Sequence, residues 1–159
     1  MSNKLSNLYF AYGSNTNLEQ MAVRCPMAKL VGTAKLKGYK LAYRSGLLTL
    51  IDDKRFSTTC ATWKITPRHE RTLDKYEGCP TLYDREYVQG KVGIFKKVNG
   101  LVYIMQPPYT DSFDLPSKHY HRACMQGYKD CGIDTEQLEM ALHEVVKINS
   151  ERRGRYEVR

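Results

Sequence analysis

The stretch LYFAYGSN, residues Leu8 to Asn15, changes character halfway along its length. Its first part is apolar and aromatic, which predicts a short buried strand over residues 8–12. The strand stops at Gly-Ser-Asn, and a helix is predicted over residues 17–24. A glycine between a strand and a helix lets the backbone approach a ligand and point successive N–H groups into one concavity. Two interpretations remain open: a turn capped by Ser14 or Asn15, or a backbone cradle for a carboxylate or an oxyanion.

Strand-like sequence continues beyond this first helix. Residues 29–51 and 58–65 are rich in the residue types that favour strands. The glycines within the first of these runs predict turns or bulges at Gly32, Gly38 and Gly46. A sheet with long, interrupted strands is therefore expected in the first half of the chain.

A helix is predicted after these strands. Thr66 can cap its N-terminus, and Pro67 is a residue favoured at the first helical position. The helix is expected to run to about Tyr76, with Gly78 as a left-handed stop.

The next segment carries a further strand and a hairpin. Residues 82–89 alternate, which places Tyr83, Arg85 and Tyr87 on one face of a strand. The runs 91–98 and 101–106 predict a hairpin, and we expect its turn at Asn99-Gly100 because Asn-Gly is the strongest short hairpin signal.

The last third of the chain has helical patterning. Ser117 can cap a helix that carries Tyr120 and closes at Gly132, and a second helix follows Asp134. Because the strands come together and the helices gather at the end, the predicted class is α+β. About six strands with little alternation favour a curled or barrel-like sheet. Residues 1–159 are expected to form a single domain.

Charge and cysteine content narrow the expected partners. The net charge is +8, but the lysines and arginines are scattered and no nucleic-acid-binding motif appears, so a solvated face is the favoured interpretation. The five cysteines form no C-x-x-C pair, which indicates neither a disulfide framework nor a zinc site. No signal-peptide pattern and no long apolar run occur. We therefore expect a cytoplasmic protein with no membrane association and no specific nucleic-acid partner.

Two sets of residues could carry chemistry. Glu77 follows the predicted helix beside Tyr76, in a segment poor in other charges. A carboxylate in a partly dry, aromatic environment has its pKa raised toward neutrality, which suits a general base. An exposed residue at a helix end is the alternative. His119 and His121 stand two residues apart on a helix and face different directions, so no metal site is expected.

Four motifs in order resemble the γ-glutamylcyclotransferase family. These are YFAYGSN at residues 9–15, LDKYEGCPTLYDR at residues 73–85, LVYIM at residues 101–105 followed by two prolines, and PSKHY at residues 116–120. The resemblance implies a mixed, barrel-like β-sheet with surrounding helices. It also implies a reaction in which a γ-glutamyl amide cyclises to 5-oxoproline and releases an amine, with no cofactor.

The resemblance also assigns roles to residues. It implies that Glu77 is the catalytic acid and base, and that backbone groups of residues 9–14 hold the γ-glutamyl end of a small-molecule substrate, with loop N–H groups on the oxyanion. It also implies that Tyr120, with Tyr103 as a weaker companion, lines the pocket. These binding residues are Tyr9, Phe10, Ala11, Tyr12, Gly13, Ser14, Asn15, Tyr103 and Tyr120. Asn15 argues against the subgroup that acts mainly on glutathione, whereas Thr16 replaces an apolar residue typical of the family. The expected substrates are γ-glutamyl amino acids, γ-glutamylamines or γ-glutamylated intermediates.

The sequence is also compatible with a second class of function, a non-catalytic protein. The same fold could serve as a non-catalytic binding or regulatory module that uses its basic surface. Glu77 favours the enzyme, because a pure binding module has no need for a carboxylate in its pocket. The chain is expected to be a monomer or a homodimer.

Overall fold

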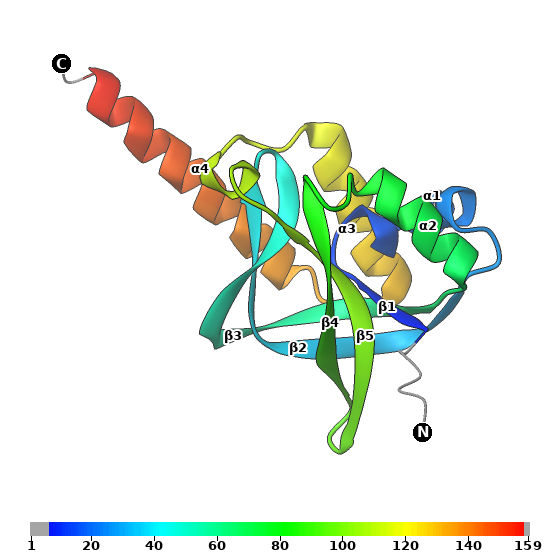
Figure 1. The fold of residues 1–159 in the computed structure, drawn as a ribbon. Helices are drawn as coiled ribbons and strands as arrows, with labels where there is room; N and C mark the ends of the chain where they lie inside the picture. Colours follow the sequence, from blue (N-terminus) through cyan, green and yellow to red (C-terminus); the bar gives the residue numbers. More distant parts are fainter. Residues whose placement is uncertain (1–6, 158–159) are drawn as a thin grey trace.

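A closed barrel forms the centre of the molecule in the computed structural model, which describes residues 7–157 (Figure 1). Its strand order is β1-β3-β2-β4-β5. The strands are β1 (Leu8–Ala11), β2 (Lys29–Arg44), β3 (Leu47–Lys64), β4 (Tyr83–Val92) and β5 (Lys96–Met105). β1 runs parallel to β5, and the other neighbouring pairs are antiparallel. The predicted α+β class with a mixed, barrel-like sheet is confirmed.

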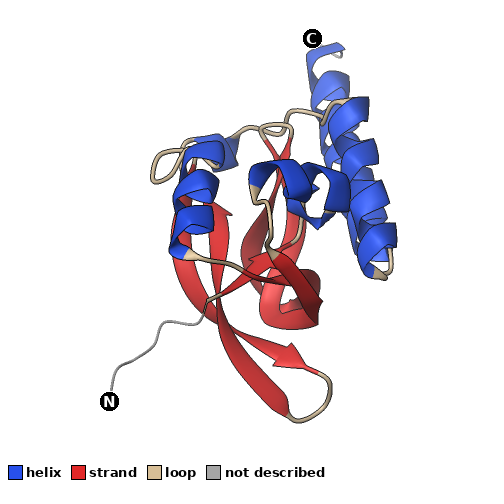
Figure 2. Cartoon of the chain, turned by 90° about the vertical axis from the view of Figure 1, so that its right-hand side faces the viewer, coloured by secondary structure: helices blue, strands red, loops and turns tan. Residues whose placement is uncertain are grey.

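Helices cover one end of the barrel. They are α1 (Leu18–Arg24), α2 (Pro67–Tyr76), α3 (Lys118–Cys131) and α4 (Glu136–Glu157), with short 3-10 helices η1 (Ser14–Thr16) and η2 (Tyr109–Asp111). α1, α2 and α3 gather at this end, whereas the β4–β5 hairpin projects at the opposite end (Figures 1 and 2). None of the helices within residues 7–157 is both long and apolar enough to cross a membrane.

The helix boundaries follow from the caps predicted in the sequence. The Thr66 and Ser117 side chains accept hydrogen bonds from the backbone N–H groups of His69 and Tyr120. α3 ends where Gly132 adopts a left-handed φ of 68°. The Thr66 and Ser117 bonds satisfy N–H groups that have no intrahelical partner in the first turn of each helix.

Two glycines bend the long β2 strand. The register between β2 and β3 shifts next to Gly32 and Gly38, whose φ angles are +144° and +87°. Both are therefore irregular points in one strand, as the sequence predicts, and Gly46 lies in the turn that joins β2 to β3. Such irregularities increase local twist and let a sheet curl into a barrel.

The predicted turn at Asn99-Gly100 is wrong. Gly100 lies within β5 and pairs with Val88, and the hairpin turns instead between Val92 and Lys96. The physical reason lies inside the barrel, where the fully buried ring of Phe10 packs on Gly100. A Cβ at Gly100 would lie 2.7 Å from that ring, so the glycine makes room for an aromatic side chain and does not serve a turn. The three predicted runs consequently form two strands.

Candidate functional site

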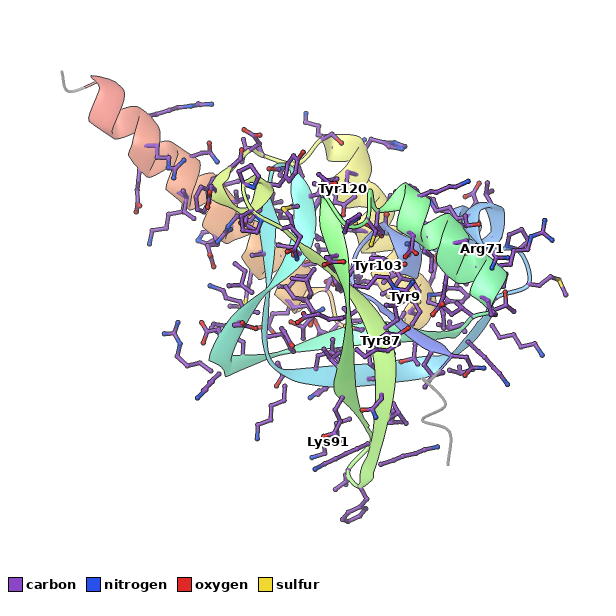
Figure 3. All side chains as sticks on the ribbon, in the orientation of Figure 1. Tyr9, Arg71, Tyr87, Lys91, Tyr103 and Tyr120 are labelled. Carbon is purple, nitrogen blue, oxygen red and sulfur yellow. The ribbon has the colours of Figure 1, made fainter. Side chains whose placement is uncertain are left out.

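A cavity of about 190 Å³ opens at the helix-covered end of the barrel. Strand ends, the loop after β1, the end of α2 and the start of α3 all contribute to it. Its lining consists of Tyr9, Tyr12, Gly13, Ser14, Asn15, Leu47, Leu48, Tyr76, Glu77, Leu82, Tyr83, Tyr103 and Tyr120. Tyr9, Tyr103 and Tyr120 lie near one another beside α2, whereas Tyr87 and Lys91 lie farther along β4 (Figure 3). Glu77 is the one ionisable carboxyl group in this lining.

Asn15 fixes the loop that follows β1. Its side-chain amide donates a hydrogen bond to the Tyr9 hydroxyl (3.0 Å), and its backbone carbonyl accepts one from the Trp63 indole (2.9 Å). The guanidinium of Arg24 donates to its side-chain oxygen at 2.6 Å. Because Asn15 is almost fully buried and bonded on three sides, the loop has a defined position.

Gly13 lies at the closest approach of this loop to α3. A Cβ built there would lie 3.1 Å from the Tyr120 hydroxyl, which is a tight contact. The φ of Gly13 is −117°, which is outside the left-handed region, so close approach is the reason for glycine at this position. Thr16 donates its backbone N–H to Gly13, which closes the first turn of η1. Ser14 and Asn15 lie inside that turn, and their N–H groups have no partner within it.

Glu77 caps the C-terminal end of α2. Its backbone N–H bonds the Leu73 carbonyl at 2.8 Å, and the left-handed Gly78 (φ 63°) turns the chain away immediately afterwards. Among the described residues, none forms a hydrogen bond or an ion pair with the Glu77 carboxyl group. Burial raises the pKa of Glu77 to about 7, and the positive charge of Arg24 limits the rise. The carboxyl group can therefore take up or release a proton near neutral pH.

The tyrosines around the cavity are held by hydrogen bonds. The Tyr12 hydroxyl donates to the Tyr103 carbonyl (2.5 Å), the Tyr83 hydroxyl donates to the Leu48 carbonyl (2.7 Å), and the Tyr120 hydroxyl accepts from the Leu48 N–H (3.3 Å). Burial holds the pKa of the phenols of Tyr12, Tyr83 and Tyr120 well above its usual value. The single O–H of Tyr12 and of Tyr83 is used in these bonds, so each of them offers a polar ligand an acceptor oxygen. The neutral Tyr120 phenol accepts from Leu48 and has an O–H that can donate.

Most of the residues predicted for the site lie at the cavity, and two do not. Phe10 and Ala11 are fully buried and do not line it. The Phe10 ring points into the barrel interior, where it packs on Gly90 and Gly100. Thr16 also lies away from the cavity. It is buried against α3, where Gly127 leaves space for it, since a Cβ at Gly127 would lie 2.1 Å from its hydroxyl.

Several residues at the site were missed by sequence reasoning. Leu47, Leu48 and Leu82 bring apolar surface to the cavity, and Tyr83 brings a hydroxyl. The strand pattern indicates only the strand face on which Tyr83 lies and not its place in the cavity lining, although Tyr83 follows Glu77 closely in the sequence. Leu47 and Leu48 reach the cavity because the β2–β3 turn ends beside it, which no local pattern reveals. Arg24 was identified only as the end of a helix.

The histidines make other contacts. His121 Nδ1 lies 2.7 Å from the Tyr43 hydroxyl, and burial lowers the pKa of this imidazole. Within residues 7–157, no group of three or more histidine, cysteine, aspartate or glutamate side chains could hold a metal ion.

Comparison with known families gives a match over most of the chain. A sequence model described as "Gamma-glutamyl cyclotransferase, AIG2-like" matches residues 9–122. This range contains the loop after β1, Glu77 and Tyr120, and therefore all of the cavity lining.

Individual relatives agree with this match. The chain is 27% identical over 146 residues to "Gamma-glutamylcyclotransferase" of Homo sapiens, covering 84% of this chain and 76% of the human protein. It is 26% identical over 143 residues to the Bos taurus protein of the same name, covering 82% and 74%. A solved structure described as "Gamma-glutamyl cyclotransferase" superposes with a TM-score of 0.75 at 25% identity, covering 84% of this chain and 85% of the other.

Proposed function

Since the chain belongs to the γ-glutamyl cyclotransferase, AIG2-like family, we propose that it cyclises a γ-glutamyl amide to 5-oxoproline and releases a free amine. The substrate class is a γ-glutamyl amino acid or a γ-glutamylamine. The observation that carries the proposal is the position of Glu77. Its carboxyl group has no partner among residues 7–157 and lines the same cavity as the Gly13–Asn15 loop.

In the proposed reaction, the substrate supplies its own nucleophile. Its α-amino nitrogen attacks the γ-carbonyl carbon, a five-membered lactam forms, and the bond from that carbon to the amide nitrogen breaks. Holding the two ends of the substrate together can lower the barrier by roughly 7–11 kcal/mol in favourable cases. The reaction is neither oxidation nor reduction, so it needs no redox cofactor.

Glu77 is proposed to move the protons. Its carboxylate takes a proton from the α-ammonium group, which frees the nitrogen lone pair for attack, and the resulting acid protonates the departing nitrogen. A pKa of about 7 suits both steps, because the group is then close to half-ionised at neutral pH. The leaving nitrogen gains the protons that the α-nitrogen loses, so the enzyme returns to its starting state.

The loop after β1 is proposed to bind the reacting carbonyl. The N–H groups of Ser14 and Asn15 lie in the first turn of η1, which leaves them without an intrahelical partner, and they can donate to the oxyanion that forms on attack. The neutral Tyr120 phenol supplies a further donor near the substrate, and the Tyr12 and Tyr83 hydroxyls, which donate to backbone carbonyls, supply acceptor oxygens. A cytoplasmic location and the absence of a specific nucleic-acid partner remain predictions.

A panel of γ-glutamyl compounds tests the proposal. Purified protein is incubated with γ-glutamyl amino acids and γ-glutamylamines, and released 5-oxoproline is measured with and without a chelator. We expect turnover of at least one compound, unaffected by chelation and abolished by Glu77→Gln. If the protein binds such compounds but releases no 5-oxoproline, it is a binding module and the proposal is wrong.

A further inference from the structure

Arg24 connects the two halves of the candidate site, although it does not line the cavity. It is the last residue of α1, and its guanidinium Nη1 donates to the side-chain oxygens of Asn15 (2.6 Å) and Ser14 (3.3 Å). The same guanidinium stacks over the ring of Tyr76, 3.8 Å from its centroid. Tyr76 immediately precedes Glu77, so one side chain touches both the loop and the helix end that carries the carboxyl group.

These contacts use the particular shape of arginine. Nη2 donates to the Gln20 side chain one turn earlier in α1 at 2.8 Å, which fixes the plane of the guanidinium. With that plane fixed, one face stacks on Tyr76 while its edge bonds the loop. A lysine ammonium has neither a planar face nor a fork of donors, so it can reproduce the charge but not the geometry.

We propose that Arg24 is a positioning residue, which fastens the Ser14–Asn15 loop to the end of α2 and holds the proposed oxyanion donors and the Glu77 carboxyl group at a fixed separation. The inference rests on the proposed function for its catalytic consequence, but not for its effect on Glu77. Small displacements of reacting groups are costly, and a shift of about 1 Å can reduce a rate about 100-fold.

The charge of Arg24 has a second effect at Glu77. The other groups around this carboxyl group are tyrosine side chains that line the cavity, and Asp74 one turn earlier is paired with Arg85 and bonded by the Tyr103 hydroxyl. The phenols belong to Tyr9, Tyr12, Tyr76, Tyr83, Tyr103 and Tyr120. Arg24 is therefore the nearby cation that favours the carboxylate form, and its removal should raise the pKa of Glu77.

Three variants separate these effects. Arg24→Met removes charge and geometry, Arg24→Lys keeps the charge alone, and Arg71→Met removes an exposed arginine from the outer side of α2 as a matched control (Figure 3). We expect Arg24→Met to lower kcat about 100-fold and to move the acid limb of kcat/KM to higher pH. Arg24→Lys should keep the acid limb near its wild-type position but still lose turnover, and Arg71→Met should resemble wild type.

A readout independent of turnover keeps this test separate from the proposed function. The Glu77 carboxyl carbon is titrated by NMR in the wild type and in the three variants, with circular dichroism as the check of folding. If no γ-glutamyl compound is turned over, the titration still decides whether Arg24 acts on Glu77. An unchanged Glu77 midpoint in Arg24→Met, together with kcat within about threefold of wild type, would overturn the inference. Should Arg24→Met fail to fold, Arg24→Lys decides it through kcat.

Discussion

The barrel interior and the cavity at its end are built from neighbouring residues of β1, yet they are filled in opposite ways. Phe10 is fully buried, and its ring touches the backbone at Gly90 and Gly100, so the interior is packed without spare volume. Tyr9 and Tyr12 instead border an open space of about 190 Å³, where their hydroxyls are held by hydrogen bonds. Close packing gives the barrel its rigidity, and that rigidity positions polar groups around a space that the chain itself leaves open.

Among the variants considered, Glu77→Gln should have the largest effect on the chemistry of the cavity. Glutamine keeps the size and one acceptor oxygen of the side chain but cannot accept a proton, so the fold should persist. Loss of a general base typically lowers turnover about 10²–10⁴-fold. The measurement is 5-oxoproline release together with the melting temperature. Turnover within a few-fold of wild type would rule out Glu77 as the base.

The pH dependence should separate activity from stability. The pKa of Glu77 rises from 4.5 to about 7 on folding, chiefly through burial. Because the carboxylate is the active form, kcat/KM should fall about tenfold for each pH unit below 7. Between pH 4.5 and 7 the folded chain holds the Glu77 proton more tightly than the unfolded chain, so the stability contributed by Glu77 decreases as pH rises.

Glu77→Gln serves as the control for this pair of trends. The variant lacks the titrating group, so its melting temperature should rise relative to wild type as pH increases from 5 to about 7.5. If the difference in melting temperature between the variant and wild type is the same at every pH, Glu77 titrates at its ordinary pKa.

Gly13→Ala should affect the cavity without affecting the barrel. The added Cβ would press on the Tyr120 hydroxyl, 3.1 Å away, and shift the loop donors or the phenol. We expect about a 100-fold loss of kcat/KM with a stability loss below about 1 kcal/mol. Ser14→Ala is the matched control, because it keeps the backbone N–H and removes two contacts of 3.3 Å. The kcat/KM of Ser14→Ala should fall about fivefold. Equal rates for both variants would contradict a role of the loop backbone.

Gly100→Ala should lower the stability of the barrel and leave activity nearly unchanged. Its Cβ would lie 2.7 Å from the ring of Phe10, which is fully buried and has no room to move, so we expect a loss of about 1–3 kcal/mol in the free energy of unfolding. Turnover of the folded protein should stay within a few-fold of wild type. Gly154→Ala is the control, because nothing lies within 4 Å of its Cβ position. Chemical denaturation distinguishes the two, and equal midpoints would mean that the interior tolerates the extra methyl group.

The difference between local signals and contacts between distant elements explains what could be predicted from the sequence. Caps and glycine breaks act within a few residues, so Thr66, Ser117 and Gly132 indicated the helix boundaries correctly. Asn99-Gly100 gave an equally strong local signal, but barrel closure puts Gly100 opposite Phe10, and packing overrides turn propensity. The family motifs indicated Glu77 and the loop. Leu48 and Arg24 could not be found in this way, because their places depend on contacts between distant elements.

Two joints of the barrel are short within residues 7–157. In this part of the chain, Tyr9 and Leu101 align the β4–β5 hairpin with β1, and Lys35 and Lys91 align it with β2. By contrast, β2 and β3 pair along most of their length. The ring of Phe10 lies between these two parts, against glycines of both β4 and β5. The Phe10 ring is therefore a side-chain wedge that helps to hold the hairpin in place, next to Tyr9 on the wall of the cavity.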